Sequence, residues 1–152
     1  MTKEEKELLL KDLCARLPHG VMAQFDYENI GKSDKEVCVI KRCYNVEGEL
    51  NILVCGNDNI GFLIEHVKPY LRPMSSMTEE EKKEFIHHAS YEIEESVNGR
   101  HYEYYLKDYV GTPEEPTCNP DAIDWLNARH FDYRGLIKKG LALEAPDGMY
   151  NN

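Results

Sequence analysis

The chain has 152 residues and a formal net charge of −10, with 41% hydrophobic and 30% charged residues. This composition is typical of a globular protein and excludes an intrinsically disordered one, and the length allows a single domain whose core needs no metal or disulfide. The apolar runs are far shorter than the ~20 residues of a membrane-spanning helix, and an acidic surface repels phosphate. We therefore expect neither membrane insertion nor direct nucleic-acid binding.

The N-terminus and the cysteines both indicate an intracellular protein. Charged residues and leucines alternate at the start of the chain, without the apolar core of a signal peptide. No C-x-x-C pair occurs among the cysteines, and Cys38 and Cys43 would lie on opposite faces of a regular strand. We expect reduced thiols, no metal site and no cofactor. The five cysteines are Cys14, Cys38, Cys43, Cys55 and Cys118.

The first predicted helix runs from Thr2 to about Arg16. Thr2 is a good N-cap, acidic residues follow in the first turn, and Pro18 and Gly20 end the helix. Its apolar stripe at helical spacing consists of Leu8, Leu9 and Leu13, with Leu10 and Leu17 beside them. This helix is expected to pack its leucines against the elements that follow.

The next part of the chain predicts strands. Runs rich in β-branched residues occupy residues 21–27, 37–40, 52–55 and 60–66, with turn signals at Glu47-Gly48 and at residues 56–59. Residues 68–77 contain two prolines, which predict an extended segment without regular structure. The economical arrangement is an antiparallel meander.

A second helix is predicted to begin at Thr78, because Thr78 and Glu81 form a capping box. Its end has two interpretations. A helical spacing of apolar residues continues to about residue 96, whereas Asn98-Gly99 before the aromatic residues 101–110 is typical of a hairpin. The sequence leaves residues 86–110 open between helix and hairpin.

After a Pro- and Gly-rich loop at residues 111–120, a third helix is predicted from Pro120 to about His130, with Trp125 in the core. Asp132 then caps a short helix, Tyr133–Lys138, which Gly140 ends in a left-handed conformation. The predicted fold is α+β: a small antiparallel sheet of three to five strands packed by about three helices, in one domain covering residues 1–152.

The segment after the third helix is the candidate site. One interpretation is structural, because nearly every residue there has a packing or capping role. The other is binding: Asp132 could orient the His130 imidazole, Tyr133 lies beside them, and Arg134 could hold an anion. No nucleophile, metal or cofactor motif accompanies them, so no catalytic residue is assigned.

Two other sequence patterns suggest a site. Glu84 with His87-His88 suggests a metal chelate, but neighbouring helix residues diverge by about 100° and no second such motif exists. Tyrosines mixed with acids, including Tyr104 and Tyr105, suggest either a binding surface or half-buried sheet residues. Residues 78–124 hold 13 acidic and 4 basic side chains, a balance of −9 that suits a basic partner or serves solubility.

Three stretches carry a resemblance. "MTKEEKELLLKDLCARLPHGV" (1–21), "KPYLRPMSSMTEEEKKEF" (68–85) and "DWLNARHFDYRGLIKKGLALEAPDGMY" (124–150) resemble a family of small proteins from gut Bacteroidales, their phages and mobile elements. The family has no assigned activity, so the resemblance implies no catalytic residue. It implies that the protein is located in the cytoplasm of a bacterial host cell.

Three functions are compatible with the sequence. The favoured one is a non-enzymatic protein-interaction or regulatory module of phage or mobile-element origin, whose partner has a basic surface. The second is a small hydrolase or ligand-binding enzyme that uses His130, Asp132 and Arg134. The third is an acidic nucleic-acid mimic that inhibits a host protein, suggested by the acids at 79–84 and 92–95. The sequence gives no oligomeric state.

Overall fold

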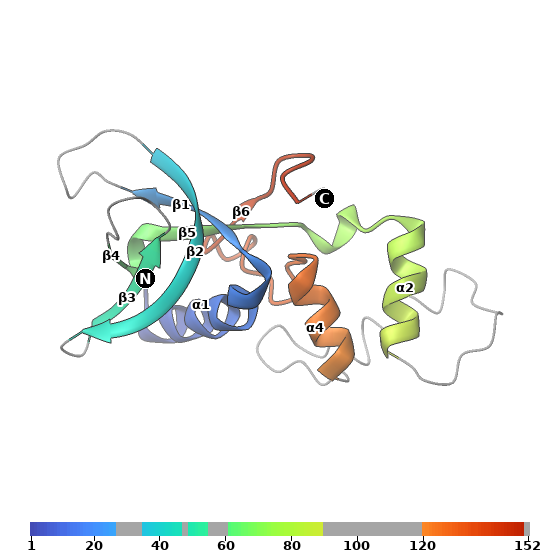
Figure 1. Ribbon diagram of the computed structural model, residues 1–152, viewed down its shortest axis with the longest axis horizontal. Coiled ribbons are helices and arrows are strands. Elements are labelled where there is room, and N and C mark those ends of the chain that lie inside the picture. Colours follow the sequence, from blue (N-terminus) through green and yellow to red (C-terminus); the bar gives the residue numbers. More distant parts are fainter. Residues whose placement is uncertain (27–34, 47–48, 55–60, 90–119, 151–152) are drawn as a thin grey trace.

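The computed structural model describes residues 1–26, 35–46, 49–54, 61–89 and 120–150 (Figure 1). Within these ranges three α-helices accompany a sheet of six strands, which confirms the predicted α+β class. The helices are α1 (Lys3–Arg16), α2 (Glu79–Ala89) and α4 (Pro120–Ala128). The strands are β1 (Met22–Asp26), β2 (Lys35–Val46), β3 (Glu49–Val54), β4 (Gly61–Leu63), β5 (Val67–Leu71) and β6 (Leu143–Glu144).

The sheet has the strand order β4-β3-β2-β1-β5-β6. The strands β1 to β4 form the predicted antiparallel meander. β5 pairs antiparallel with β1, and β6 pairs with β5 in parallel. This last strand was not predicted, because it has two residues. It runs parallel to β5 because the chain returns to the sheet edge only after α2, α4 and the segment beyond them.

The prediction that residues 68–77 lack regular structure is wrong for their first part. Val67–Leu71 forms β5, and Pro69 pairs with Ala23 of β1. Proline is tolerated here because β6 covers only the last two residues of β5, which leaves the strand almost an edge strand. The strand predicted at residues 60–66 is also shorter, since Ile64–His66 forms a 3₁₀ turn.

A register shift in β2 changes which face its cysteines occupy. The pairing of β2 with β3 slips between Ile40 and Arg42, as a β-bulge does. A bulge shifts the alternation of side chains by one residue, and both Cys38 and Cys43 pack against the same core. The expectation that they face opposite sides is therefore wrong, because it assumed a regular strand.

The helices enclose two apolar clusters. The first lies between α1 and the sheet and includes Leu9, Leu13 and Phe25. The second lies between α2, α4 and the segment after α4, where Trp125 stacks on Phe131 with ring centroids 5.8 Å apart. Figure 1 shows α1 against one face of the curved sheet, with α2 and α4 beyond the end of β5. The predicted core role of Trp125 is confirmed.

The predicted capping box at Thr78 is present, and Thr2, predicted as an N-cap, forms a second capping box with Glu5. Glu5 N–H donates to the Thr2 hydroxyl while Thr2 N–H donates to the Glu5 carboxylate, and Thr78 and Glu81 repeat the pattern. The described part of α2 ends at Ala89, so the choice between helix and hairpin for 86–110 falls mostly outside the described residues, as does the loop at 111–119. In the part of the chain that is described, no helix is both long enough and apolar enough to cross a membrane.

Candidate functional site

The candidate site is the corner, defined as residues 129–142 between α4 and β6. At its start the chain leaves α4 through a left-handed residue, His130, with a φ of 59°. Phe131 N–H donates to the Leu126 carbonyl (3.0 Å) and His130 N–H to that of Asn127 (3.1 Å), which is a Schellman-type helix end. Glycine usually occupies this position, and a residue with a Cβ costs roughly 1–2 kcal/mol there. The surrounding contacts must therefore hold His130 in place.

His130 is buried, with 4% of its surface exposed. Its imidazole stacks on the Tyr150 ring, the centroids being 3.7 Å apart, and its Nδ1 has no hydrogen-bond partner among the described residues. Burial, followed by the positive charges of Arg16 and His19, lowers the pKa of His130 to about 4. The ring is therefore neutral at pH 7.

Asp132 caps the turns that follow it. Its carboxylate accepts hydrogen bonds from the amides of Leu136 (2.7 Å) and Ile137 (2.8 Å), while burial raises its pKa. The predicted helix Tyr133–Lys138 is wrong, because the segment consists of turns. Gly135 at φ 69° interrupts any helical run after Asp132, although Gly140 is left-handed (φ 72°) as predicted.

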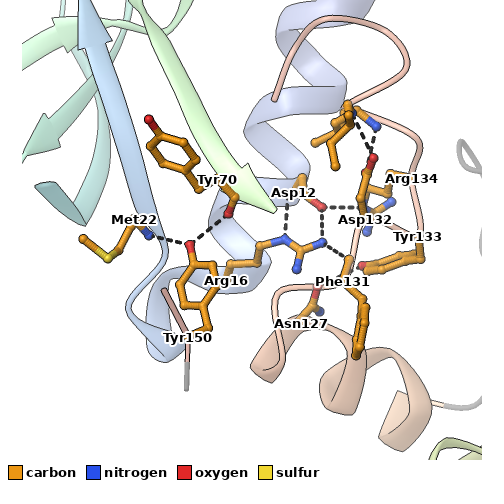
Figure 2. A network of polar contacts seen from close by, with 12 residues as sticks. Asp12, Arg16, Met22, Tyr70, Asn127, Phe131, Asp132, Tyr133, Arg134 and Tyr150 are labelled. Atoms are coloured by element: carbon orange, nitrogen blue, oxygen red, sulfur yellow. Dashed lines mark hydrogen bonds and ion pairs between the residues drawn. The ribbon is translucent and has the colours of Figure 1, made fainter. Parts of the chain in front are cut away.

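A buried ion pair from α1 reaches into the corner (Figure 2). Arg16 and Asp12 are fully buried and share two hydrogen bonds, Nε to Oδ2 at 2.7 Å and Nη2 to Oδ1 at 2.9 Å. The same Nη2 donates to the Phe131 carbonyl at 2.8 Å. Arg16 of α1 thereby holds the backbone of the corner, which lies more than one hundred residues later in the sequence.

Arg134 adds a second buried guanidinium to this group. Its Nε lies 3.3 Å from Asp12 Oδ1, close enough for an ion pair, but the N–H is not aligned for a hydrogen bond. The guanidinium stacks over the Tyr133 ring at 4.8 Å, and the Tyr133 hydroxyl donates to Asn127 Oδ1 at 3.0 Å. The buried polar cluster, Asp12, Arg16, Arg134 and the Phe131 carbonyl, lies between the two apolar clusters.

Tyr150 closes the gap where β1 and β5 separate. The register of the two strands ends at Ala23 and Pro69, and the Tyr150 hydroxyl bridges the next pair. It accepts from Met22 N–H (3.0 Å) and donates to the Tyr70 carbonyl (2.8 Å), as Figure 2 shows. Immediately after β5, the chain pairs with the corner through an isolated parallel bridge between Arg72 and Phe131.

The predicted site residues do not converge on an open space. His130 stacks on Tyr150, Tyr133 and Arg134 face Asn127 and Asp12, and Asp132 caps backbone amides. All four side chains are buried, with exposed fractions between 3% and 8%. Tyr104 and Tyr105 lie outside the described residues. No group of three or more metal-ligating side chains occurs among the described residues, His87 and His88 included.

The residues that sequence reasoning missed are Asp12, Arg16 and Tyr150. Asp12 and Arg16 follow Leu9 by three and seven positions, which places them on the apolar stripe of α1. A charged i, i+4 pair on that stripe was the available signal of a buried ion pair. No sequence pattern indicated the role of Tyr150, because that role depends on where β1 and β5 separate.

The acidic start of α2 is also engaged internally. Glu81 accepts two hydrogen bonds from Arg72, at 2.7 and 2.9 Å, and this pairing lowers the Glu81 pKa. Glu84 pairs with Arg129 of the corner, whose guanidinium lies 4.7 Å from the Trp125 ring centroid. Two of the acids that suggested a nucleic-acid mimic thus hold α2 against the corner.

Asp12→Asn is expected to destabilise the fold strongly. The change leaves two buried guanidinium groups without a negative partner, which costs about 3–5 kcal/mol. Urea unfolding monitored by circular dichroism measures the loss, with the exposed Glu7→Gln as a control that changes the free energy of unfolding little. A loss below about 1 kcal/mol for Asp12→Asn contradicts a structural role for the ion pair.

His130→Asn is expected to flatten the pH dependence of stability. The folded pKa of about 4 lies below the usual 6.5, so the unfolded chain binds the proton more tightly. The contribution of His130 is complete above pH 6.5 and is lost, by about 2–3 kcal/mol, as pH falls toward 4. Asparagine tolerates the left-handed backbone and does not titrate.

The measurement compares unfolding free energies of wild type and His130→Asn between pH 4 and 7.5. The exposed His87→Asn should keep the wild-type profile. Parallel profiles for wild type and His130→Asn would mean that the imidazole is not held neutral by burial.

Tyr150→Phe is expected to cost about 1–3 kcal/mol, because it leaves a backbone donor and a backbone acceptor without their bridge. Thermal and urea unfolding measure the effect. Tyr70→Phe, which removes one partly exposed bond to Gln24, is the matched control and should cost less. Equal effects of the two changes would contradict the bridging role.

The chain matches no protein-family model, no curated protein and no solved structure. No relative therefore assigns a role to any side chain of the corner.

Proposed function

We propose that this protein is a non-enzymatic protein-interaction module whose corner is a structural brace. The proposal rests on one observation: the polar side chains of the corner contact other groups of the same protein and are mostly shielded from solvent. His130, Asp132 and Arg134 are 3–8% exposed, and each meets a ring, a backbone amide or Asp12. A general acid, base or anion clamp must reach its substrate, so this arrangement does not favour the hydrolase alternative.

A surface for a partner lies beside the corner. A groove of about 280 Å³ has Arg72, Pro73 and Ser76 on one side and residues 144–150 on the other. Met149 and Tyr150 are half-buried in its lining. Tyr150 is anchored by its hydroxyl and by His130, so this wall is rigid before a partner binds. Rigid walls reduce the entropy that binding costs.

The charge of this groove favours a basic segment. Glu144 and Asp147 are exposed in its lining. The cation in the lining, Arg72, is held by both oxygens of Glu81 and is not free to bind an anion. A partner segment carrying Lys or Arg complements this surface, and complementary charges raise the association rate.

The resemblance supports a phage or mobile-element setting in a bacterial cytoplasm. The three stretches that carry it, residues 1–21, 68–85 and 124–150, contribute the parts that meet at the corner. Asp12 and Arg16 come from the first, Arg72 and Glu81 from the second, and Phe131 from the third. The brace and the groove are thus built from the same segments.

Binding of basic peptides tests the proposal. In an NMR titration of the full chain with Lys- and Arg-rich peptides, shifts are expected at residues 144–150. The double variant Glu144→Gln, Asp147→Asn should weaken binding at least about fivefold, since each exposed charge is worth up to ~1 kcal/mol. Glu7→Gln on α1 is the matched control.

Added salt should weaken the same binding, because exposed charges are screened beyond about 10 Å at 0.1 M. Acidic peptides of equal length should not bind. Shifts confined to other surfaces, or equal affinity for the double variant and wild type, would contradict this groove as the partner site.

A further inference from the structure

Two cysteines meet where α1 packs against β2. Cys14 lies on α1 between Leu10 and Leu17 at helical spacing, and both leucines pack against the first apolar cluster. Cys43 lies on β2 and packs partly buried against the same cluster. The helix α1 contacts β2, and Cys14 is close enough to Cys43 to contribute to its raised pKa. A helix thiol and a strand thiol are therefore neighbours.

The bulge in β2 makes this meeting possible. Without the register shift between Ile40 and Arg42, residue 43 would alternate to the face opposite Ile40. With the shift, Cys43 joins Ile40 on the side that α1 covers. Cys14 is exposed, so a small reagent can reach this pair from solvent.

We infer that Cys14 and Cys43 form a thiol-modification site, at which a low-molecular-weight disulfide such as oxidised glutathione reversibly closes a Cys14–Cys43 disulfide. The pair lies outside the groove, so the site stands whether or not the groove binds a partner.

The reaction is two successive thiol–disulfide exchanges. Cys14 loses its proton to solvent, and its sulfur attacks the reagent's S–S bond, forming a mixed disulfide and releasing one glutathione thiolate. Cys43 then loses its proton, attacks the Cys14 sulfur and expels the second glutathione thiolate. Both thiolates take up a proton. The two protein thiols lose two electrons together, and one small disulfide is reduced to two thiols.

The surroundings set the order of the two steps. Burial, followed by the proximity of Cys14, raises the pKa of Cys43 to about 12, so Cys43 is almost entirely protonated at neutral pH. The exposed Cys14 is the thiol that a reagent meets first. Cys43 then acts as the resolving thiol, favoured by its proximity to Cys14.

Closure would fasten α1 to the sheet. The same helix carries Asp12 and Arg16, which hold the corner. Because a disulfide restricts the unfolded chain, the oxidised protein should resist unfolding better than the reduced protein. Oxidation of this pair then raises the free energy of unfolding, while the contacts of Asp12 and Arg16 with the corner stay the same.

The test incubates the full-length protein with oxidised glutathione, alkylates the remaining thiols and maps the peptides by mass spectrometry. The expected product is a Cys14–Cys43 disulfide that dithiothreitol reverses, with Cys38 alkylated. The oxidised protein should have a higher urea midpoint than the reduced protein. Cys14→Ser and Cys43→Ser should each abolish that difference, whereas Cys38→Ser on the same strand should keep it.

The experiment is repeated with Cys55→Ser and Cys118→Ser together, because both cysteines lie outside the described residues. Closure of Cys14–Cys43 in this background supports the inference. A glutathione adduct that persists on Cys14 while Cys43 stays alkylatable overturns it. Preferential bonding of Cys14 or Cys43 to another cysteine also overturns it.

Discussion

The hydrogen bond from Arg16 to the Phe131 carbonyl joins α1 to the corner. Asp12 makes that hydrogen bond possible, because it pairs with the Arg16 guanidinium. A fully buried guanidinium is unfavourable without a carboxylate, and Asp12 supplies both of its oxygens. Leu9 and Leu13, on the same helix as this pair, belong to the first apolar cluster, and Phe131, whose carbonyl Arg16 holds, belongs to the second. An ion pair in this position does not add much net stability by itself, but it fixes how α1 and the corner meet.

The remaining features of the corner follow from this fixed geometry. The backbone at Phe131 is held by Arg16 on one side and pairs with Arg72, the residue after β5, on the other. His130 immediately before it takes the left-handed conformation that reverses the chain out of α4. Tyr150 covers the imidazole and closes the gap between β1 and β5. The polar side chains of the corner are thereby used within the protein, and the proposed binding surface is the groove beside the corner.

Local signals in the sequence predicted the elements better than their assembly. The N-cap at Thr2, the capping box at Thr78, the left-handed Gly140 and the core position of Trp125 follow from rules that span a few residues. The bulge in β2 and the strand through Pro69 depend on partners distant in sequence, whereas the turns after Asp132 follow from the left-handed Gly135 within the segment. The pairing of Arg16 with the corner also depends on a distant partner: the charged pair on the stripe of α1 indicated burial, but nothing in the sequence identified Phe131.

The most direct test of coupling between the two apolar clusters is whether two unfolding transitions coincide. Trp125 is the single tryptophan of the chain and lies in the second cluster, so its fluorescence reports that cluster, whereas far-ultraviolet circular dichroism reports the helices and the sheet together. If the buried ion pair couples the two clusters, both signals change at the same urea concentration in wild type and separate when Asp12 is replaced by Asn. A Trp125 transition that already precedes the dichroism transition in wild type would contradict the coupling.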